Sequence, residues 1–355
     1  MTRTVDIAPL EEALTFAQTK AQDGERLIAV RAYQEGQIRG VDLSSLRASA
    51  SEDAIDLIHR LGQDAIRAFV QAAKDEVEVS SDHLGLPIRL GDQNIGVGTN
   101  YAEHAAESTV VGSPFLFPKI VQPTAWDAPI PAGDALLDFE VELCLVPLEA
   151  LMPGSPVFGG LILGNDVTDR AVLLRNVDIA DPQSGKGFTS GKSGPHYLPV
   201  GDLFVVPRNL PSFLSRLTLQ LSVNGQVRQH AAATDWIWDL EEIVRQCRLK
   251  RDVRWTYWGG EARLAFGEAA DIPARTVIMA GTPAGTVFHG VPTKDRLMGA
   301  LAWLLSGCKG PLIAKVIERY IKSARAAKTY LQPGDRVDIR VDRLGCLSNH
   351  IVAAL

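Results

Sequence analysis

The spacing of apolar side chains along the first part of the chain predicts a small mixed α/β unit. Apolar residues recur at helical intervals over residues 11–22 and again over residues 54–74. Between these stretches, residues 26–42 alternate polar and apolar side chains around Glu35-Gly36, as in a short β-hairpin. We therefore expect a small N-terminal α/β domain over residues 1–90.

The pattern changes after residue 94, where short β-rich segments are separated by Gly and Pro. These segments are residues 95–97, 139–146, 161–165, 217–223, 276–280 and 336–341. Repeated short strands separated by turn residues predict a mainly β (α+β) body over residues 91–355.

Two helical stretches interrupt this β-rich body. Residues 234–245 have the spacing of a short helix, and residues 294–331 place apolar side chains on one face and charged ones on the other. We expect a helical insert over about residues 287–331. Its apolar face has to be buried, either as the wall of a pocket or as a peripheral decoration that only stabilises the fold.

The overall composition excludes several classes of protein. Hydrophobic residues make up 46% and charged residues 22% of the 355 positions, as in globular proteins, and the net charge of −6 offers no basic face to nucleic acid or to an anionic membrane. The apolar run at 297–305 is too short to cross a bilayer, and residues 1–10 lack the apolar stretch of a signal peptide. The four cysteines are dispersed without zinc-binding spacing, which is typical of reduced thiols. We expect a cytoplasmic protein without nucleic-acid or membrane partners.

Three acidic residues alternate with apolar residues between positions 138 and 143. In a β-strand, Asp138, Glu140 and Glu142 would lie on one face, because successive side chains point to opposite sides. If that face is enclosed, a hard divalent cation would offset the repulsion between the carboxylates. The alternative is the solvated outer face of an amphipathic strand.

A further acidic residue, Asp166, follows the apolar run at 161–163 in the sequence GNDVTDR (164–170). An Asp just past a buried strand can supply a third oxygen ligand, and Arg170 can orient it. The alternative is an ordinary Asn-Asp turn.

The segment GVGTNYAEHAAE (96–107) contains a histidine three positions before a glutamate. Tyr101 stands where a dinucleotide-binding fingerprint needs its third Gly, so that function is excluded. His104 and Glu107 would lie on the same side of a helical turn. A carboxylate beside an imidazole raises its basicity and fixes its tautomer, as a general base requires. The alternative is a surface ion pair.

The segment KGFTSGKS (186–193) resembles a phosphate-binding loop only superficially. Lys186 occupies the place of the first Gly of that motif, and Pro195 would interrupt the helix that should follow. Lys192 remains a candidate for an ammonium group that stabilises developing negative charge.

Taken in order, these segments resemble the fumarylacetoacetate hydrolase family. The blocks that resemble it are GVGTNYAEHAAE (96–107), FLFPK (115–119), DFEVEL (138–143), GNDVTDR (164–170), GKSGPHYLPVG (191–201), AGTPAG (280–285) and LQPGDRVDIRVDRLGCLSNHIV (331–352). The resemblance implies a mixed β-roll catalytic domain behind a small N-terminal domain, and a homodimer. Leu173 departs from the pattern, because some hydrolases of the family have a substrate-binding Gln at that place.

The resemblance also implies roles for individual residues. It implies that Glu140, Glu142 and Asp166 hold Mg²⁺ or Mn²⁺, with Ca²⁺ as a further candidate, and that His104 activates water with Glu107 as its partner. Among the remaining candidates, Lys192 is implied to stabilise negative charge, and the substrate contacts are predicted to come from Lys119, Arg170 and Thr282.

The implied activity is metal-dependent hydrolysis of a carbon–carbon bond in a β-dicarbonyl or acylpyruvate-like oxo-acid. A lyase of the same family, either an oxo-acid decarboxylase or a hydratase-dehydratase, is the second interpretation, because these reactions pass through the same enolate. A non-catalytic binding protein is the third. The coexistence of His104, Lys192 and three acidic residues in family order favours an enzyme.

Overall fold

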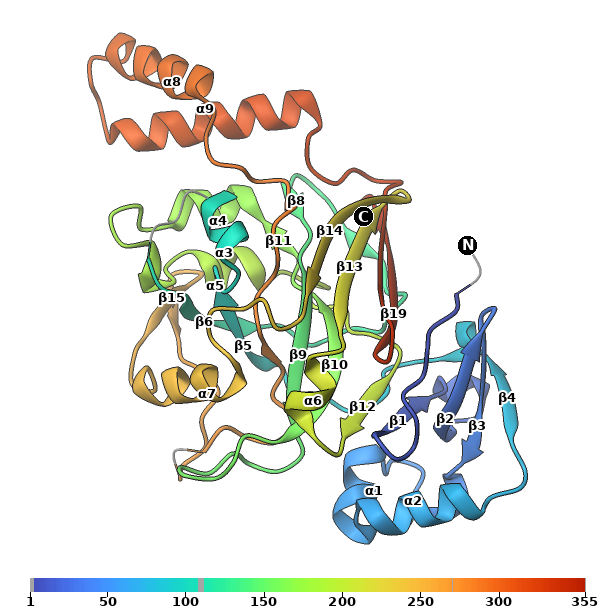
Figure 1. Cartoon of the computed structure of the whole chain (residues 1–355). Coiled ribbons are helices and arrows are strands. Elements are labelled where there is room, and N and C mark those ends of the chain that lie inside the picture. The colour runs from blue at the N-terminus through green and yellow to red at the C-terminus, as the bar shows by residue number, and fades with distance from the viewer. Residues whose placement is uncertain (1–2, 108–111, 270, 355) are drawn as a thin grey trace.

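The computed structural model describes residues 3–107, 112–269 and 271–354, so the outermost residues of the two predicted domains, 1–2 and 355, lie outside it. Its described part is built on a ten-stranded sheet (Figure 1). The strand order is β4 (Val77–Ser80), β3 (Gln37–Asp42), β2 (Leu27–Gln34), β1 (Ala13–Gln18), β12 (Phe204–Pro207), β10 (Gly159–Asn165), β9 (Val141–Pro147), β17 (Ile278–Met279), β5 (Gln93–Gly98) and β6 (Phe115–Ile120).

A five-stranded sheet packs against this large sheet. Its order is β14 (Gln226–Ala232), β13 (Thr218–Val223), β18 (Arg336–Val341), β19 (Gly345–Val352) and β7 (Ile130–Pro131). Two small ladders pair β8 (Leu137–Asp138) with β11 (Thr168–Asp169), and β15 (Trp255–Tyr257) with β16 (Gly260–Ala262). The expected mixed β architecture is confirmed.

Strand β9 lies between two hydrophobic cores, and all of its residues are buried. Leu143 and Leu145 face the core that contains Leu219 of the five-stranded sheet. Cys144 and Val146 on the opposite face pack in the second core, which the N-terminal helices close through residues such as Leu57. Burial on both faces explains why this strand reads as a nearly continuous apolar run after Glu142.

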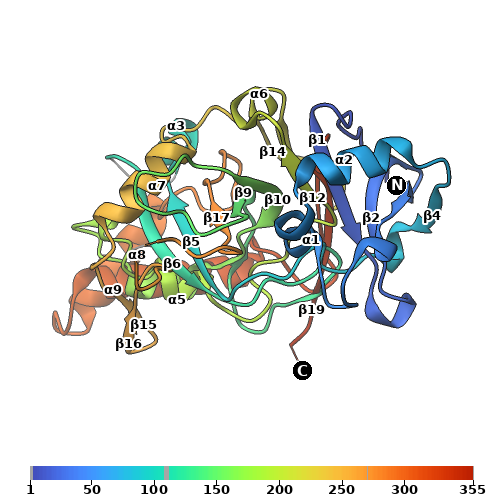
Figure 2. The same ribbon diagram turned by 90° about the horizontal axis from the view of Figure 1, so that it is seen from below.

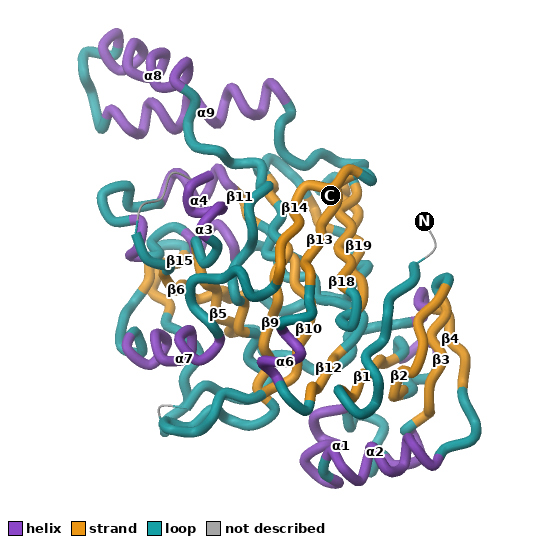
Figure 3. Tube along the Cα trace, viewed as in Figure 1, coloured by secondary structure: helices purple, strands orange, loops and turns teal. Residues whose placement is uncertain are grey.

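The helices lie around the two sheets (Figure 3). They are α1 (Ala54–Leu61), α2 (Gln63–Ala72), α3 (Ala102–Glu107), α4 (Arg170–Asn176), α5 (Phe188–Lys192), α6 (Leu210–Leu214), α7 (Leu240–Leu249), α8 (Thr293–Leu305) and α9 (Leu312–Ala327). No helix in the described ranges is both long enough and apolar enough to cross a membrane.

The predicted hairpin at residues 26–42 is confirmed. β2 and β3 pair around Glu35 and Gly36, whose φ angles of 51° and 77° form the two-residue turn that fits the twist of antiparallel strands. The helical stretch at 54–74 is also confirmed, although Gly62, with φ 78°, divides it into α1 and α2. The helix expected at 234–245 begins later, at Leu240, after Asp239 caps its N-terminus by accepting a hydrogen bond from the N–H of Glu242.

The prediction of a helix at residues 11–22 is wrong, because the structure forms strand β1 there. β1 pairs with β12 on one side and β2 on the other, and residues 13–17 are buried. Pairing with a strand about two hundred residues away overrides the local helical spacing, since tertiary context outweighs propensity in a buried strand. The predicted domain boundary near residue 90 stays a prediction.

Helices α8 and α9 form a hairpin that Figures 1 and 2 both place at the opposite end of the molecule from β1–β4. Ile317, Tyr320 and Ile321 of α9 pack against Leu173 and Leu174 of α4. An exposed ion pair between Arg175 and Glu318, with N–O distances of 2.6 and 2.9 Å, joins the same two helices. The apolar face predicted for the insert is therefore buried only in α9. The expectation is wrong for α8, where Leu297, Leu301, Leu304 and Leu305 are 47–80% exposed.

Asp202 joins the N-terminal strands to the C-terminal hairpin. Its Oδ2 accepts a hydrogen bond from the Tyr33 hydroxyl and its Oδ1 from the N–H of Cys346, both at 2.8 Å. Burial raises the pKa of Asp202 to about 6, although these two hydrogen bonds oppose the shift. Because folding raises this pKa, protonated Asp202 favours the folded state below about pH 4. This contribution to stability is lost as the pH rises through about 6.

We expect Asp202→Asn to remove this part of the pH dependence of stability. The wild-type free energy of unfolding, relative to the variant, should fall by roughly 2–3 kcal/mol between about pH 4 and 7.5, at about 1.4 kcal/mol per pKa unit. Urea unfolding of both proteins at several pH values measures this difference. Parallel pH profiles would show that Asp202 has an ordinary pKa.

Candidate active site

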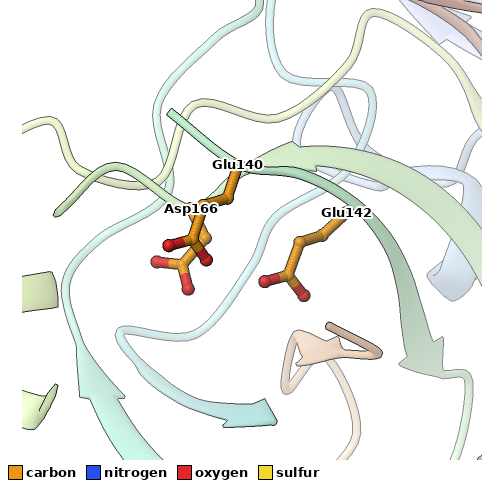
Figure 4. Close-up of side chains that lie close together, drawn as sticks. All are labelled: Glu140, Glu142 and Asp166. Carbon is orange, nitrogen blue, oxygen red and sulfur yellow. The ribbon is translucent and has the colours of Figure 1, made fainter. Parts of the chain in front are cut away.

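Three carboxylates gather where strands β9 and β10 lie side by side. Glu142 is in β9, Glu140 lies just before it, and Asp166 follows the last residue of β10. The antiparallel register pairs Gly164 with Glu142, and the N–H of Asp166 donates to the carbonyl of Glu140 at 2.9 Å. One ligand oxygen from each carboxylate lies within 4.8 Å of the others, and all three side chains are buried. Figure 4 shows the three side chains close together. The solvated-face alternative is thereby excluded.

Cationic side chains surround two of these carboxylates. The Lys192 ammonium donates to Glu140 at 2.7 Å and to Asp166 at 2.9 Å. Lys119 donates to the other oxygen of Asp166 at 2.5 Å, and Arg170 donates to Glu140 at 2.7 Å. The negative charges of Glu140 and Asp166 are therefore offset within the protein.

Glu142 is in a different situation. Its carboxylate accepts a hydrogen bond from the backbone N–H of Gly281 at 2.7 Å. Burial raises the pKa of Glu142 well above its usual range, and the negative charges of Asp166 and Glu140 raise it further.

The balance of buried charges around the three carboxylates tests whether a cation fits between them. The acidic groups are Asp138, Glu140, Glu142 and Asp166, and the basic groups are Lys119, Arg170 and Lys192. Among the described residues of this site one buried negative charge thus stays uncompensated, and carboxylate oxygens are the ligands that Mg²⁺ and Mn²⁺ prefer. The residues fit a divalent cation, which Glu140, Glu142 and Asp166 would hold.

Asp138 does not lie with Glu140 and Glu142, although the alternation of the sequence predicts all three on one face. The ladder breaks at Phe139 and Glu140, between β8 and β9. Asp138 accepts hydrogen bonds from Arg170 at 2.8 Å and from the N–H of Val287 at 2.9 Å. It therefore fixes Arg170 and the start of the insert rather than joining the metal-binding group.

His104 and Glu107 lie on short helix α3, beside this cluster. His104 Nδ1 and Glu107 Oε2 are 3.3 Å apart, and His104 is 7% exposed, which excludes a surface pair. Glu107 also accepts a hydrogen bond from the N–H of Gly285 at 3.0 Å and contacts His289 at 3.2 Å. Burial raises the pKa of Glu107, but the hydrogen bonds from His104 and Gly285 outweigh it and lower the pKa below its usual range. Glu107 is thus an ionised partner that orients the imidazole.

A cavity of about 670 Å³ opens from this region. Its polar end is lined by His104, Glu140, Arg170, Lys192 and Thr282. Lys119 is fully buried and donates to Asp166 and to the carbonyl of Lys192, both at 2.5 Å. The predicted contact of Lys119 with the substrate stays a prediction.

Gln229 of β14 is a site residue that no local motif indicated. Its amide nitrogen donates to Thr282 Oγ1 at 2.9 Å and to the carbonyl of Pro283 at 2.7 Å, while its oxygen accepts from the N–H of Val141 at 2.9 Å. Because Val141 lies between Glu140 and Glu142, Gln229 ties the carboxylate strand to the Thr282 loop. A lone Gln in an otherwise exposed strand gives no sequence signal for this role.

The fold, the buried acidic cluster that could hold a metal ion and the adjacent His–Glu pair together define a class of proteins with a mixed β fold. The family model described as fumarylacetoacetate (FAA) hydrolase C-terminal matches residues 93–352. The chain belongs to the fumarylacetoacetate hydrolase family. Family membership supports an enzyme, and the named relatives include both hydrolases and isomerases or tautomerases.

Individual relatives are distant. An oxaloacetate tautomerase of Bacillus subtilis is 25% identical over 288 residues, which is 77% of this chain and 74% of that protein. Fumarylacetoacetate hydrolase of Exiguobacterium antarcticum has 20% identity and a TM-score of 0.60, covering 96% of this chain and 100% of that one. Maleylpyruvate hydrolase of Sphingobium sp., solved with manganese(II) and pyruvate, has 17% identity and a TM-score of 0.59 over the same shares. These two structural likenesses establish the fold.

Proposed function

We propose that this protein hydrolyses a carbon–carbon bond in an acylpyruvate-like 2,4-dioxo acid, with Mg²⁺ or Mn²⁺ bound by Glu140, Glu142 and Asp166. The observation that favours this function is the buried cluster with one uncompensated negative charge, next to the His104–Glu107 pair at the polar end of one cavity. The manganese and pyruvate in the Sphingobium neighbour support the same choice of metal and oxo-acid.

A bound divalent cation would supply Lewis-acid polarisation of the substrate's oxo group. The protein supplies the proton transfers. His104, oriented by Glu107, takes a proton from water, whose oxygen adds to the acyl carbonyl. The bond between that carbonyl and the methylene then breaks, and its electron pair goes to the methylene as an enolate. The proton held by His104 returns to this carbon, so that water and substrate give one carboxylic acid and pyruvate.

Three further polar residues at the cavity's end are placed to assist. Lys192 keeps a fixed positive charge close to the reacting groups, since Glu140 and Asp166 hold its ammonium group. Arg170, fixed by Asp138, lines the cavity and offers a donor to a substrate oxygen. Thr282, held by Gln229, offers a hydroxyl at the same end.

A tautomerase is the second candidate, because the B. subtilis relative aligned over most of the chain is named as one. The same base could move a proton between carbon and oxygen without adding water. Product analysis separates the two reactions. Hydrolysis yields two acids, tautomerisation yields none, and a lyase that decarboxylates would release carbonate.

We expect the Mn²⁺-loaded protein to convert acetylpyruvate to acetate and pyruvate. Excess chelator should remove the activity, and Mn²⁺ or Mg²⁺ should restore it, because the buried cluster needs the cation to offset its charge. Coupled detection of pyruvate, with acetate measured by NMR, tests this. Interconversion of keto and enol forms without either product would support the tautomerase instead.

A further inference from the structure

The cavity has a polar end and an apolar remainder. Beyond His104, Glu140, Arg170 and Lys192, its wall is formed mostly by aliphatic and aromatic side chains from several parts of the chain. They include Leu173 and Leu174 of α4, Val177 and Ile179 of the following loop, Phe188 of α5, and Leu312, Ile313, Val316 and Ile317 of α9. The side chains opposite the reacting groups therefore offer contact area but few hydrogen bonds.

Exposure increases along this apolar wall. Leu173 and Ile317 are 4% and 6% exposed, whereas Ile313 and Ile179 are 45% and 51% exposed. The wall thus runs from the protein interior to an open mouth between α9 and the loop after α4. Among the lining residues that are described, Arg296 adds a charge away from the polar end; it is exposed, and its Nε donates to the carbonyl of Val291 at 2.8 Å.

The helical hairpin is responsible for this wall. α9 contributes four lining residues, and α8 contributes Arg296 and Ala300. Gly299 brings the two helices together, because a Cβ at that position would lie 2.6 Å from the Cα of Val316. The hairpin is thus closely packed and presents one face to the cavity.

We infer that the cavity binds an extended apolar group, so that the substrate is an oxo-acid with an apolar alkyl or aryl tail. This inference rests on the proposed function for the identity of the acid end. A tail of roughly six to ten carbons suits the volume, because pockets of about 300–1,000 Å³ enclose drug-sized molecules. The oxo-acid lies at the polar end, and the tail follows the α4–α9 wall toward the mouth.

A binding series that needs no turnover tests the tail site. The Mn²⁺-loaded protein is titrated calorimetrically with 2-oxobutanoate, 2-oxohexanoate and 2-oxooctanoate. Each buried methylene contributes about 0.8 kcal/mol, which is about fourfold in affinity, so the longest acid, with four more methylenes, should bind roughly two hundredfold more tightly than the shortest. Equal affinities across the series would overturn the inference.

Arg296 defines the competing substrate class, an oxo-acid with a second carboxylate at the far end. Titration with 2-oxooctanedioate, which has the same length as 2-oxooctanoate, distinguishes the two classes. An apolar site should bind the diacid at least about tenfold more weakly, since burying an unpaired carboxylate is unfavourable. Equal or tighter binding of the diacid would overturn the inference and assign Arg296 to a distal carboxylate.

Two matched substitutions on α8 locate the tail. Ala300 lines the cavity, whereas Ala302 is exposed and does not. Ala300→Phe should reduce the affinity for 2-oxooctanoate to near that for 2-oxobutanoate and leave the short acid unaffected, while Ala302→Phe should change neither. Unchanged affinity for 2-oxooctanoate in Ala300→Phe would exclude this wall as the tail site.

A milder variant covers the case in which Ala300→Phe disrupts the hairpin. Ile313→Thr keeps a β-branched side chain at a half-exposed position and places a hydroxyl in the wall, so it should weaken 2-oxooctanoate binding severalfold without affecting 2-oxobutanoate.

A chain-length effect without cleavage of acetylpyruvate would refute the proposed reaction but leave the tail site standing. Cleavage of acetylpyruvate without a chain-length effect would refute the tail site alone.

Discussion

Glu142→Gln is expected to abolish metal-dependent activity while leaving the metal-free protein as stable as the wild type or more so. Glu142 holds the negative charge that the surrounding lysines and arginine do not offset, and burial together with Asp166 and Glu140 already raises its pKa. Replacing it by an amide removes this unfavourable charge and one metal ligand together. Mn²⁺ affinity should fall by more than the roughly 10–100-fold that loss of an outer-shell contact typically costs.

Calorimetric titration of Mn²⁺ and thermal unfolding with and without the ion measure both halves of this prediction. Asp202→Asn is the matched control, since it also neutralises a fully buried carboxylate but lies outside the cluster. It should leave Mn²⁺ affinity unchanged. Wild-type Mn²⁺ affinity in Glu142→Gln would remove this residue from the metal site.

His104→Gln is expected to lower kcat by about a hundred- to ten-thousandfold, the usual contribution of a general base, with Mn²⁺ affinity retained. The reason is that His104 contacts Glu107 and lines the cavity without belonging to the carboxylate cluster. Turnover of acetylpyruvate and Mn²⁺ titration on the same preparation separate the chemical role from the metal site. Near-wild-type turnover would assign His104 a structural role.

His289→Gln provides the comparison for this experiment. His289 contacts the other oxygen of Glu107 at 3.2 Å, but its side chain is 60% exposed. An exposed polar contact of this kind contributes under about 1 kcal/mol, so its loss should change turnover by no more than about fivefold. A loss as large as that in His104→Gln would mean that the two histidines serve Glu107 jointly.

The local part of the site follows from the sequence. Period-two alternation predicts that Glu140 and Glu142 lie together, and the end of an apolar run predicts Asp166 at a strand terminus; the structure brings all three together. Spacing along one helical turn brings His104 to Glu107. Each of these relations depends on neighbours in the chain, and that is why pattern alone predicts it.

The remaining features depend on contacts between distant segments. Asp138 obeys the alternation in sequence, but a break in the ladder turns it to Arg170. Gln229 reaches Thr282 only because β14 folds beside the carboxylate strand. The spacing of residues 11–22 predicts a helix where strand β1 forms, because the pairing with β2 and β12 cannot be seen in the local pattern. The family resemblance, rather than spacing, connected the separate motifs into one site.

Anomalous diffraction from crystals grown with Mn²⁺ tests the central claim most directly. We expect one manganese peak within about 2.0–2.3 Å of an oxygen from each of Glu140, Glu142 and Asp166, the distance range of hard cations bound by carboxylates. The same peak should be lost from crystals of Glu142→Gln. A wild-type protein saturated with Mn²⁺ that shows no peak between these three carboxylates would contradict the account.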